Sequence, residues 1–162
     1  MFSWRITKYN PKNRDEKGNY LDDKEWTFFS EVGTEVNEED YLRTESNYIN
    51  AITTFMDEMG LKKLYINALE IWSDEVENQN ASPFLSKMWV GKSISMQEIK
   101  ELAKLTLRNV VWCKLSYKNK FFVHFGYEYY MFIGAINDCP NARQKVEKSG
   151  LYVEDFISPY LR

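Results

Sequence analysis

The chain has 162 residues, of which 44% are hydrophobic and 16% aromatic, and its formal net charge is −3 from 21 basic and 24 acidic side chains. This length fits one domain, and the hydrophobic content excludes a disordered chain. The sequence has no apolar run of the ~18 residues that a membrane span needs, and its first residues lack the order of a secretory signal. We therefore expect one globular domain over residues 1–162, located in the cytoplasm. The mild acidity also argues against nucleic acid as a partner, and no membrane partner is expected.

Cys113 and Cys139 are the only cysteines, and His124 is the only histidine. In a cytoplasmic protein, two cysteines this far apart in the sequence are expected to stay reduced. One imidazole and two thiols do not complete the four ligands of a zinc site without carboxylates. We expect no disulfide, no metal and no cofactor.

The first elements are predicted from side-chain periodicity. Residues 2–9 alternate between apolar and polar side chains, which is typical of a half-buried strand. Residues 10–24 are almost wholly polar and are predicted as a loop. A second strand is predicted over 25–32, which carries Trp26 and Phe29, and the two strands are expected to pair as a hairpin.

Two long helices follow, each with a clear start signal. Asn37 is predicted as the N-cap of the first, whose apolar side chains recur at helical spacing until Gly60 ends it. Ser95 and Glu98 form a capping box at the start of the second helix, which ends near Asn109.

The remaining elements complete an α+β pattern. Between the helices, residues 61–72 are predicted as a strand, 73–83 as a loop and 84–90 as a short helix. Beyond the second helix, three apolar runs predict an antiparallel meander, and Pro140 begins a short helix that Gly150 ends. The three runs are residues 110–117, 121–126 and 129–136. We expect an antiparallel sheet that includes this C-terminal three-stranded meander and is covered on one face by the two main helices.

The register of the meander is predicted from its polarity. Two three-residue turns, Lys118–Lys120 and Gly126–Glu128, make one side of the three strands wholly apolar. In this register Leu115 faces Val123, and Val123 faces Met131. The other side carries the candidate partner-binding or ligand-binding residues, which are Trp112, Phe122 and Phe132 around a row of Lys114, His124 and Tyr130.

Two alternatives are open for this aromatic side of the sheet. If it is exposed, it is expected to dock a partner or to form a ligand groove. Otherwise the tail, residues 151–162, or the N-terminal hairpin covers it as a second small core. A register slipped by one residue would place Cys113 opposite His124 as a thiol–imidazole pair. We disfavour that register because it mixes polar and apolar side chains on both faces.

Acidic side chains cluster around the end of the predicted strand 61–72, where no helix N-terminus explains them. They are expected to form an acidic rim that faces a basic partner. The four residues are Glu70, Asp74, Glu75 and Glu77.

No catalytic motif is complete. Residues 91–93 (Gly-Lys-Ser) resemble the end of a phosphate-binding loop, but Ser86 replaces the first glycine of that motif, and no G-x-S-x-G elbow occurs. We therefore predict no catalytic residue. An enzyme or small-ligand protein is the alternative, with His124 as a base and Tyr130 or Lys114 polarising the substrate.

Two segments, Thr7–Pro11 (TKYNP) and His124–Tyr130 (HFGYEYY), resemble stretches of small, uncharacterised proteins of Gram-positive bacteria. In size, acidity and aromatic content, the chain is also similar to the immunity proteins that neutralise bacterial toxins. This resemblance implies a bacterial source and a protein partner, and it transfers no catalytic residue. We predict a non-enzymatic, cytoplasmic protein-binding protein that docks through the aromatic side of the sheet. The alternative is a small-ligand protein or enzyme with a pocket around His124, and a third interpretation is a protein that self-associates.

Overall fold

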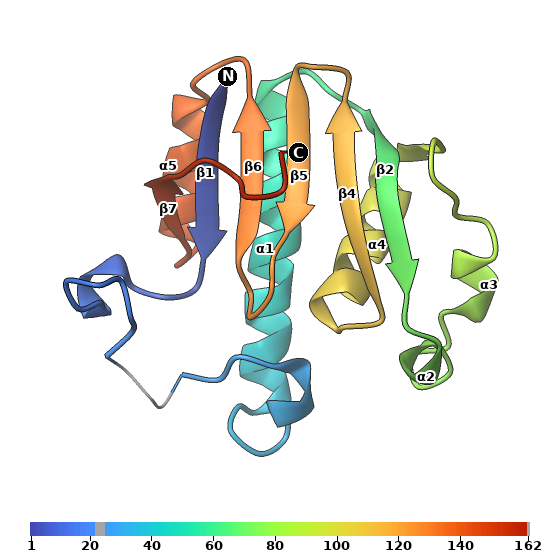
Figure 1. Cartoon of the computed structure of the whole chain (residues 1–162), viewed down its shortest axis with the longest axis horizontal. Coiled ribbons are helices and arrows are strands. Elements are labelled where there is room, and N and C mark those ends of the chain that lie inside the picture. Colours follow the sequence, from blue (N-terminus) through green and yellow to red (C-terminus); the bar gives the residue numbers. More distant parts are fainter. Residues whose placement is uncertain (22–24, 162) are drawn as a thin grey trace.

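The computed structural model describes residues 1–21 and 25–161, and its centre is a seven-stranded antiparallel sheet with the long helices on one side (Figure 1). The strand order across the sheet is β3-β2-β4-β5-β6-β1-β7. The strands are β1 (Phe2–Thr7), β2 (Lys63–Ile71), β3 (Ser93–Ser95), β4 (Val111–Tyr117), β5 (Phe121–Phe125), β6 (Met131–Ala135) and β7 (Tyr152–Asp155). The helices are α1 (Glu38–Glu58), α2 (Ser73–Val76), α3 (Ser82–Leu85), α4 (Met96–Leu107) and α5 (Pro140–Lys148), with short 3₁₀ helices η1 (Pro11–Asn13) and η2 (Phe29–Glu31). The predicted α+β class, with the meander β4-β5-β6 inside the sheet, is confirmed.

Both long helices begin at their predicted caps. The Asn37 side chain accepts the backbone N–H of Asp40 at 2.7 Å at the start of α1. At the start of α4, the Ser95 hydroxyl accepts the N–H of Glu98 at 3.3 Å, and the Glu98 carboxylate accepts the N–H of Ser95 at 3.0 Å. These bonds satisfy donors that the first turn of a helix leaves without intrahelical partners, so the sequence defines both starts locally.

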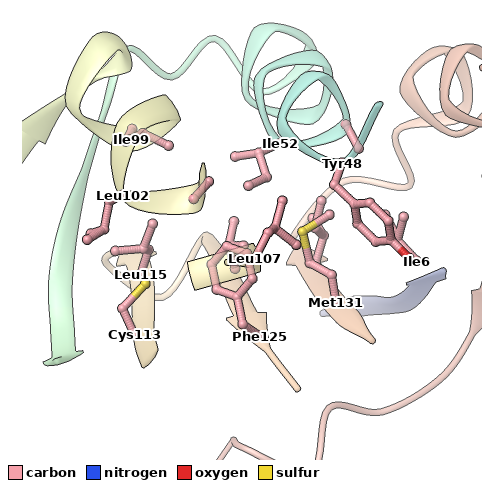
Figure 2. Packing of buried hydrophobic residues seen from close by; sticks show 14 of the residues in the cluster. Ile6, Tyr48, Ile52, Ile99, Leu102, Leu107, Cys113, Leu115, Phe125 and Met131 are labelled. Atoms are coloured by element: carbon pink, nitrogen blue, oxygen red, sulfur yellow. The ribbon is translucent and has the colours of Figure 1, made fainter. Parts of the chain in front are cut away.

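The hydrophobic core lies between the helices and the sheet (Figure 2). α1 contributes Ile52, and α4 contributes Ile99 and Leu102. Opposite them, the strands contribute Leu115 and Met131, and all of these side chains are fully buried. Burial of a side chain of this size stabilises the fold by roughly 1.5–3 kcal/mol. The buried face of the meander is the one whose residues the sequence predicts to be apolar.

A partly buried ion pair joins α1 to the end of α4. The half-buried Arg108 guanidinium donates to both carboxylate oxygens of the buried Glu45, from Nε at 2.8 Å and from Nη2 at 2.9 Å. Its Nη1 donates to the side-chain oxygen of Gln79 at 2.9 Å, and the Tyr41 hydroxyl donates to Glu45 at 2.6 Å. Because loss of Arg108 would leave the buried Glu45 carboxylate without its charged partner, this pair helps to fix how the two helices face each other.

Residues 25–32 form no strand, so the predicted N-terminal hairpin is wrong. β1 instead pairs with β6 on one side and with β7 on the other. The segment turns locally because the Glu31 carboxylate accepts the backbone N–H groups of Thr27 and Phe28, at 2.7 and 3.0 Å. Its aromatic rings pack against α1 and against the β5–β6 turn rather than alternating across a sheet.

Shorter segments also differ from their predictions. The predicted loop 10–24 contains η1, and its residues 22–24 lie outside the described part of the chain. The predicted loop 73–83 holds α2, and the helix predicted over 84–90 is α3, which starts one residue before Pro83. Proline suits the first turn of a helix, where its missing N–H costs nothing. The edge strands β3 and β7 are too short for periodicity to reveal them.

The predicted register of the meander is confirmed between β4 and β5, where Leu115 pairs with Val123. Between β5 and β6 it is wrong by two residues, because Val123 pairs with Ile133 rather than with Met131. The turn spans residues 126–130 instead of the three predicted, and two consecutive non-glycine residues in it have positive φ. A shift of two residues keeps each side chain on its predicted face.

Gly134 lies under the ring of Phe122, its cross-strand neighbour, and a Cβ atom added there would lie 2.0 Å from the ring. We expect Gly134→Ala to lower the free energy of unfolding by about 2 kcal/mol, because the buried ring has to move. In a Phe122→Ala background the same change is expected to be neutral or stabilising, since glycine in a strand costs roughly 0.5–1 kcal/mol relative to alanine. Urea denaturation of the wild type, both single variants and the double variant measures the difference. An equal loss in both backgrounds would contradict the role of the ring.

Candidate functional site

The sheet face opposite the helices carries a row of cross-strand neighbours. Lys114 of β4 pairs with His124 of β5, and His124 pairs with Phe132 of β6. Phe132 also pairs with Arg5 of β1, which pairs with Glu154 of β7. The row therefore joins Lys114 to His124 as predicted, and the two-residue register shift puts Phe132 in the third position.

An ion-pair network lies at the β1–β7 end of this row. Glu154 accepts from Arg5 Nε at 3.1 Å and from Arg14 Nη1 at 2.6 Å. Burial by itself would raise the pKa of Glu154, but its hydrogen bonds to the two guanidinium groups lower that pKa below its usual value. The Arg5 guanidinium lies 4.3 Å from the ring centroid of Phe156 and 5.3 Å from that of Tyr130. Tyr130, predicted for the row, is thus half-buried beside Arg5 instead.

Residues 156–161, which we call the C-terminal strap, cross this face from β1 toward β5 (Figure 1). The backbone N–H of Phe156 donates to the carbonyl oxygen of Ser3 at 3.1 Å. The N–H of Ser158 donates to the Ser3 hydroxyl at 3.3 Å, and the Ser158 hydroxyl lies 2.7 Å from Nδ1 of His124. The strap is therefore tied to both β1 and β5.

Aromatic packing adds to these hydrogen bonds. The ring centroid of Tyr160 lies 5.8 Å from that of Trp112 and 5.9 Å from that of Phe132, and Phe156 lies 5.7 Å from Phe132. Trp112 stays half-buried. Phe122, His124 and Phe132 on this face each have an exposed fraction of only 5%. Of the two alternatives for this face, the structure has the second small core, with the strap as its cover.

His124 is a buried, neutral imidazole. Burial, with a smaller contribution from the charge of Lys114, lowers the pKa of His124 to about 4. Its ring stacks on Phe122 with centroids 4.3 Å apart. The Ser158 hydroxyl beside it also accepts the N–H of Tyr160 at 3.2 Å and is buried. This serine–histidine contact therefore ties the strap to β5.

The thiol–imidazole alternative does not match the geometry. Cys113 lies on the helix side of the sheet, with Sγ 3.5 Å from Oγ1 of Thr106 in α4, whereas His124 lies on the other side. Burial raises the pKa of Cys113 to about 12 and that of Cys139 to about 11. Both thiols are free and protonated at neutral pH, so neither has the thiolate character of a nucleophile.

A cavity of about 250 Å³, which we call the His124 cavity, opens beside the end of the strap. Lys114, Phe122 and His124 of β4 and β5 line one side, and Tyr160 and Leu161 of the strap line another. The other lining residues are Met1, Asn67, Ser116, Lys118, Asn119 and Phe121. Among the described residues, no carboxylate side chain lines this cavity.

The structure brings one of the four predicted acidic residues beside the aromatic face. Glu70 pairs with Trp112 across β2 and β4. Asp74 and Glu75 lie on α2, and Glu77 follows directly after it. All four side chains are exposed, so they form an acidic corner at the end of β2 rather than a rim around His124.

A second concave region, which we call the terminal groove, is not predicted from the sequence. It measures about 850 Å³ and lies between the start of β1, the start of α5 and the start of the strap. The exposed fractions of its large apolar side chains are 63% for Met1, 47% for Phe2, 39% for Phe156 and 77% for Ile157. The sequence contains one signal for this groove, the adjacent apolar pair Phe156-Ile157. Neighbouring side chains of an extended segment point to opposite faces, so the two cannot both pack on the sheet.

Within residues 1–21 and 25–161, no group of three or more His, Cys, Asp or Glu side chains is arranged to hold a metal ion. The same part of the chain contains no helix with the length and apolar character needed to span a bilayer. No protein-family model matches the chain, and neither does any curated protein or solved structure.

His124 gives the stability of the fold a defined pH dependence. Its pKa is about 4 in the folded protein and about 6.5 in the unfolded chain, so the unfolded state binds more protons between these values. We expect the free energy of unfolding to fall as the pH is lowered from 6.5 to 4, by at most about 3 kcal/mol. His124→Asn keeps an acceptor near Ser158 without titrating in this range, and its stability should fall less. Identical pH profiles for the two proteins in urea denaturation would contradict this assignment.

Proposed function

We propose that this protein binds another protein and that the contact surface is the terminal groove. The observation that carries the proposal is the gathering of exposed Met1, Phe2, Phe156 and Ile157 around one concavity. Exposure of large apolar side chains to water is unfavourable in free energy, and a partner that covers them removes this penalty. The sequence favours the aromatic side of the sheet for docking, but the strap covers much of that side. We therefore place the contact surface for the partner at the edge of that face, in the terminal groove.

The rim of the groove carries both signs of charge, with a small excess of acidic groups. Asp138 and Asp155 supply carboxylates, and Arg143, which also lines the groove, donates to Asp138 at 2.9 Å. This excess favours a partner with basic side chains around an apolar anchor. The net charge of −3 adds a weak long-range attraction for a basic surface. A small acidic protein that covers part of a larger one, like the immunity proteins that this chain resembles, is consistent with such a surface.

A photo-cross-linking amino acid at Ile157, in the full chain expressed in its own host, tests this proposal. We expect one partner to be cross-linked from Ile157 and not from Val90, which is also exposed but lies outside the groove. With the purified partner, Phe2→Ser should weaken binding about ten-fold or more, because buried apolar anchors carry much of the energy of an interface. Val90→Ser is the matched control and should leave binding unchanged.

Two results would overturn the proposal. Equal cross-linking from Ile157 and Val90, or none from either, would show that the groove has no specific partner. A single product at twice the mass of the chain would show that the groove binds a second copy, which light scattering at two concentrations then confirms.

A further inference from the structure

The His124 cavity differs in chemistry from the terminal groove, although Met1 lines both. Lys114 of β4 supplies an ammonium group, which can only donate hydrogen bonds. Ser116 of β4, Asn119 of the β4–β5 turn and Asn67 at the irregular position in β2 add hydroxyl and amide groups, which can donate or accept. Among the described residues, no carboxylate in the lining opposes the positive charge. This lining favours a ligand that carries oxygen acceptors and a negative charge.

The other part of the cavity is apolar and partly aromatic. Phe122 lies at its base, and Tyr160 and Leu161 of the strap form one wall. The stacking of Phe122 on His124 and the contact between His124 and Ser158 keep this part in place. Such surfaces favour a flat or compact apolar body, since aromatic faces pack well against other rings.

The size of the cavity limits the ligand. Its volume of about 250 Å³ lies just below the ~300–1,000 Å³ of sites that hold drug-sized molecules. A single ring with one charged group fits this volume, whereas a nucleotide or a peptide would extend out of the cavity into solvent. An inorganic anion satisfies the donors and leaves the apolar part unused.

We propose that the His124 cavity binds a small organic anion, namely a carboxylate on an aromatic or similarly compact apolar body. The carboxylate lies toward Lys114, the cross-strand neighbour of His124, and the apolar body lies against Phe122 and Tyr160.

The single histidine provides the readout, because its ring gives one Cε1–H signal in the NMR spectrum of the full chain. The probes are benzoate, its uncharged analogue benzamide, and inorganic phosphate, each titrated at constant ionic strength. We expect benzoate to shift the His124 signal saturably with a Kd of roughly 1 mM. Benzamide and phosphate should each bind at least five-fold more weakly, because benzamide lacks the negative charge and phosphate lacks the apolar body.

Lys114→Gln and Lys120→Gln are the matched variants, since both lysines belong to the β4–β5 hairpin and only Lys114 lines the cavity. Lys114→Gln should weaken benzoate binding by roughly three- to ten-fold and leave benzamide unchanged, while Lys120→Gln alters neither. The proposal is overturned if benzoate produces no saturable shift, or if benzamide or phosphate binds as well as benzoate. Equal effects of the two lysine variants would also overturn it, because they would show general charge attraction rather than a site.

Discussion

Strands β5 and β6 need burial on both faces, and the rest of the structure depends on how that need is met. Every residue from Phe121 to Phe125 and from Met131 to Ala135 is buried. The helices cover one face, so without a second cover the rings of Phe122 and Phe132 would lie in water. The strap supplies that cover, and Gly134 leaves the space in which the ring of Phe122 lies. The same cover keeps His124 neutral, since burial is the main cause of its lowered pKa.

The strap has the alternation of an extended segment with one face on the sheet. Phe156, Ser158 and Tyr160 make the hydrogen bonds and ring contacts, whereas the intervening Ile157 and Pro159 are exposed. Its first residues line the terminal groove, and its last residues line the His124 cavity. Both candidate sites are therefore positioned by the same few contacts to β1 and β5.

Features that depend on nearby residues are predictable from this sequence, and features that depend on distant contacts are not. The caps at Asn37 and Ser95 act within three residues, and the faces of the meander follow from period-two polarity. The β5–β6 turn is missed because Glu128 and Tyr129 both take positive φ, which non-glycine residues rarely adopt. The aromatic residues and His124 are found as one cluster for the same periodic reason. The sequence does not predict which segment covers this cluster, because an apolar tail does not indicate the distant surface on which it packs.

The position of β1 in the sheet has a consequence for how the chain is made. β1 pairs only with β6 and β7, so that Ile6 lies opposite Met131 and Trp4 opposite Asp155. At synthesis rates of ~5–20 residues per second, this strand waits on the order of ten seconds for its first partner to emerge from the ribosome. Non-local pairing of this kind is also slow to close. Until then the backbone donors and acceptors of β1 are unpaired, as at the edge of a sheet, so this strand is open to pairing with other chains during synthesis.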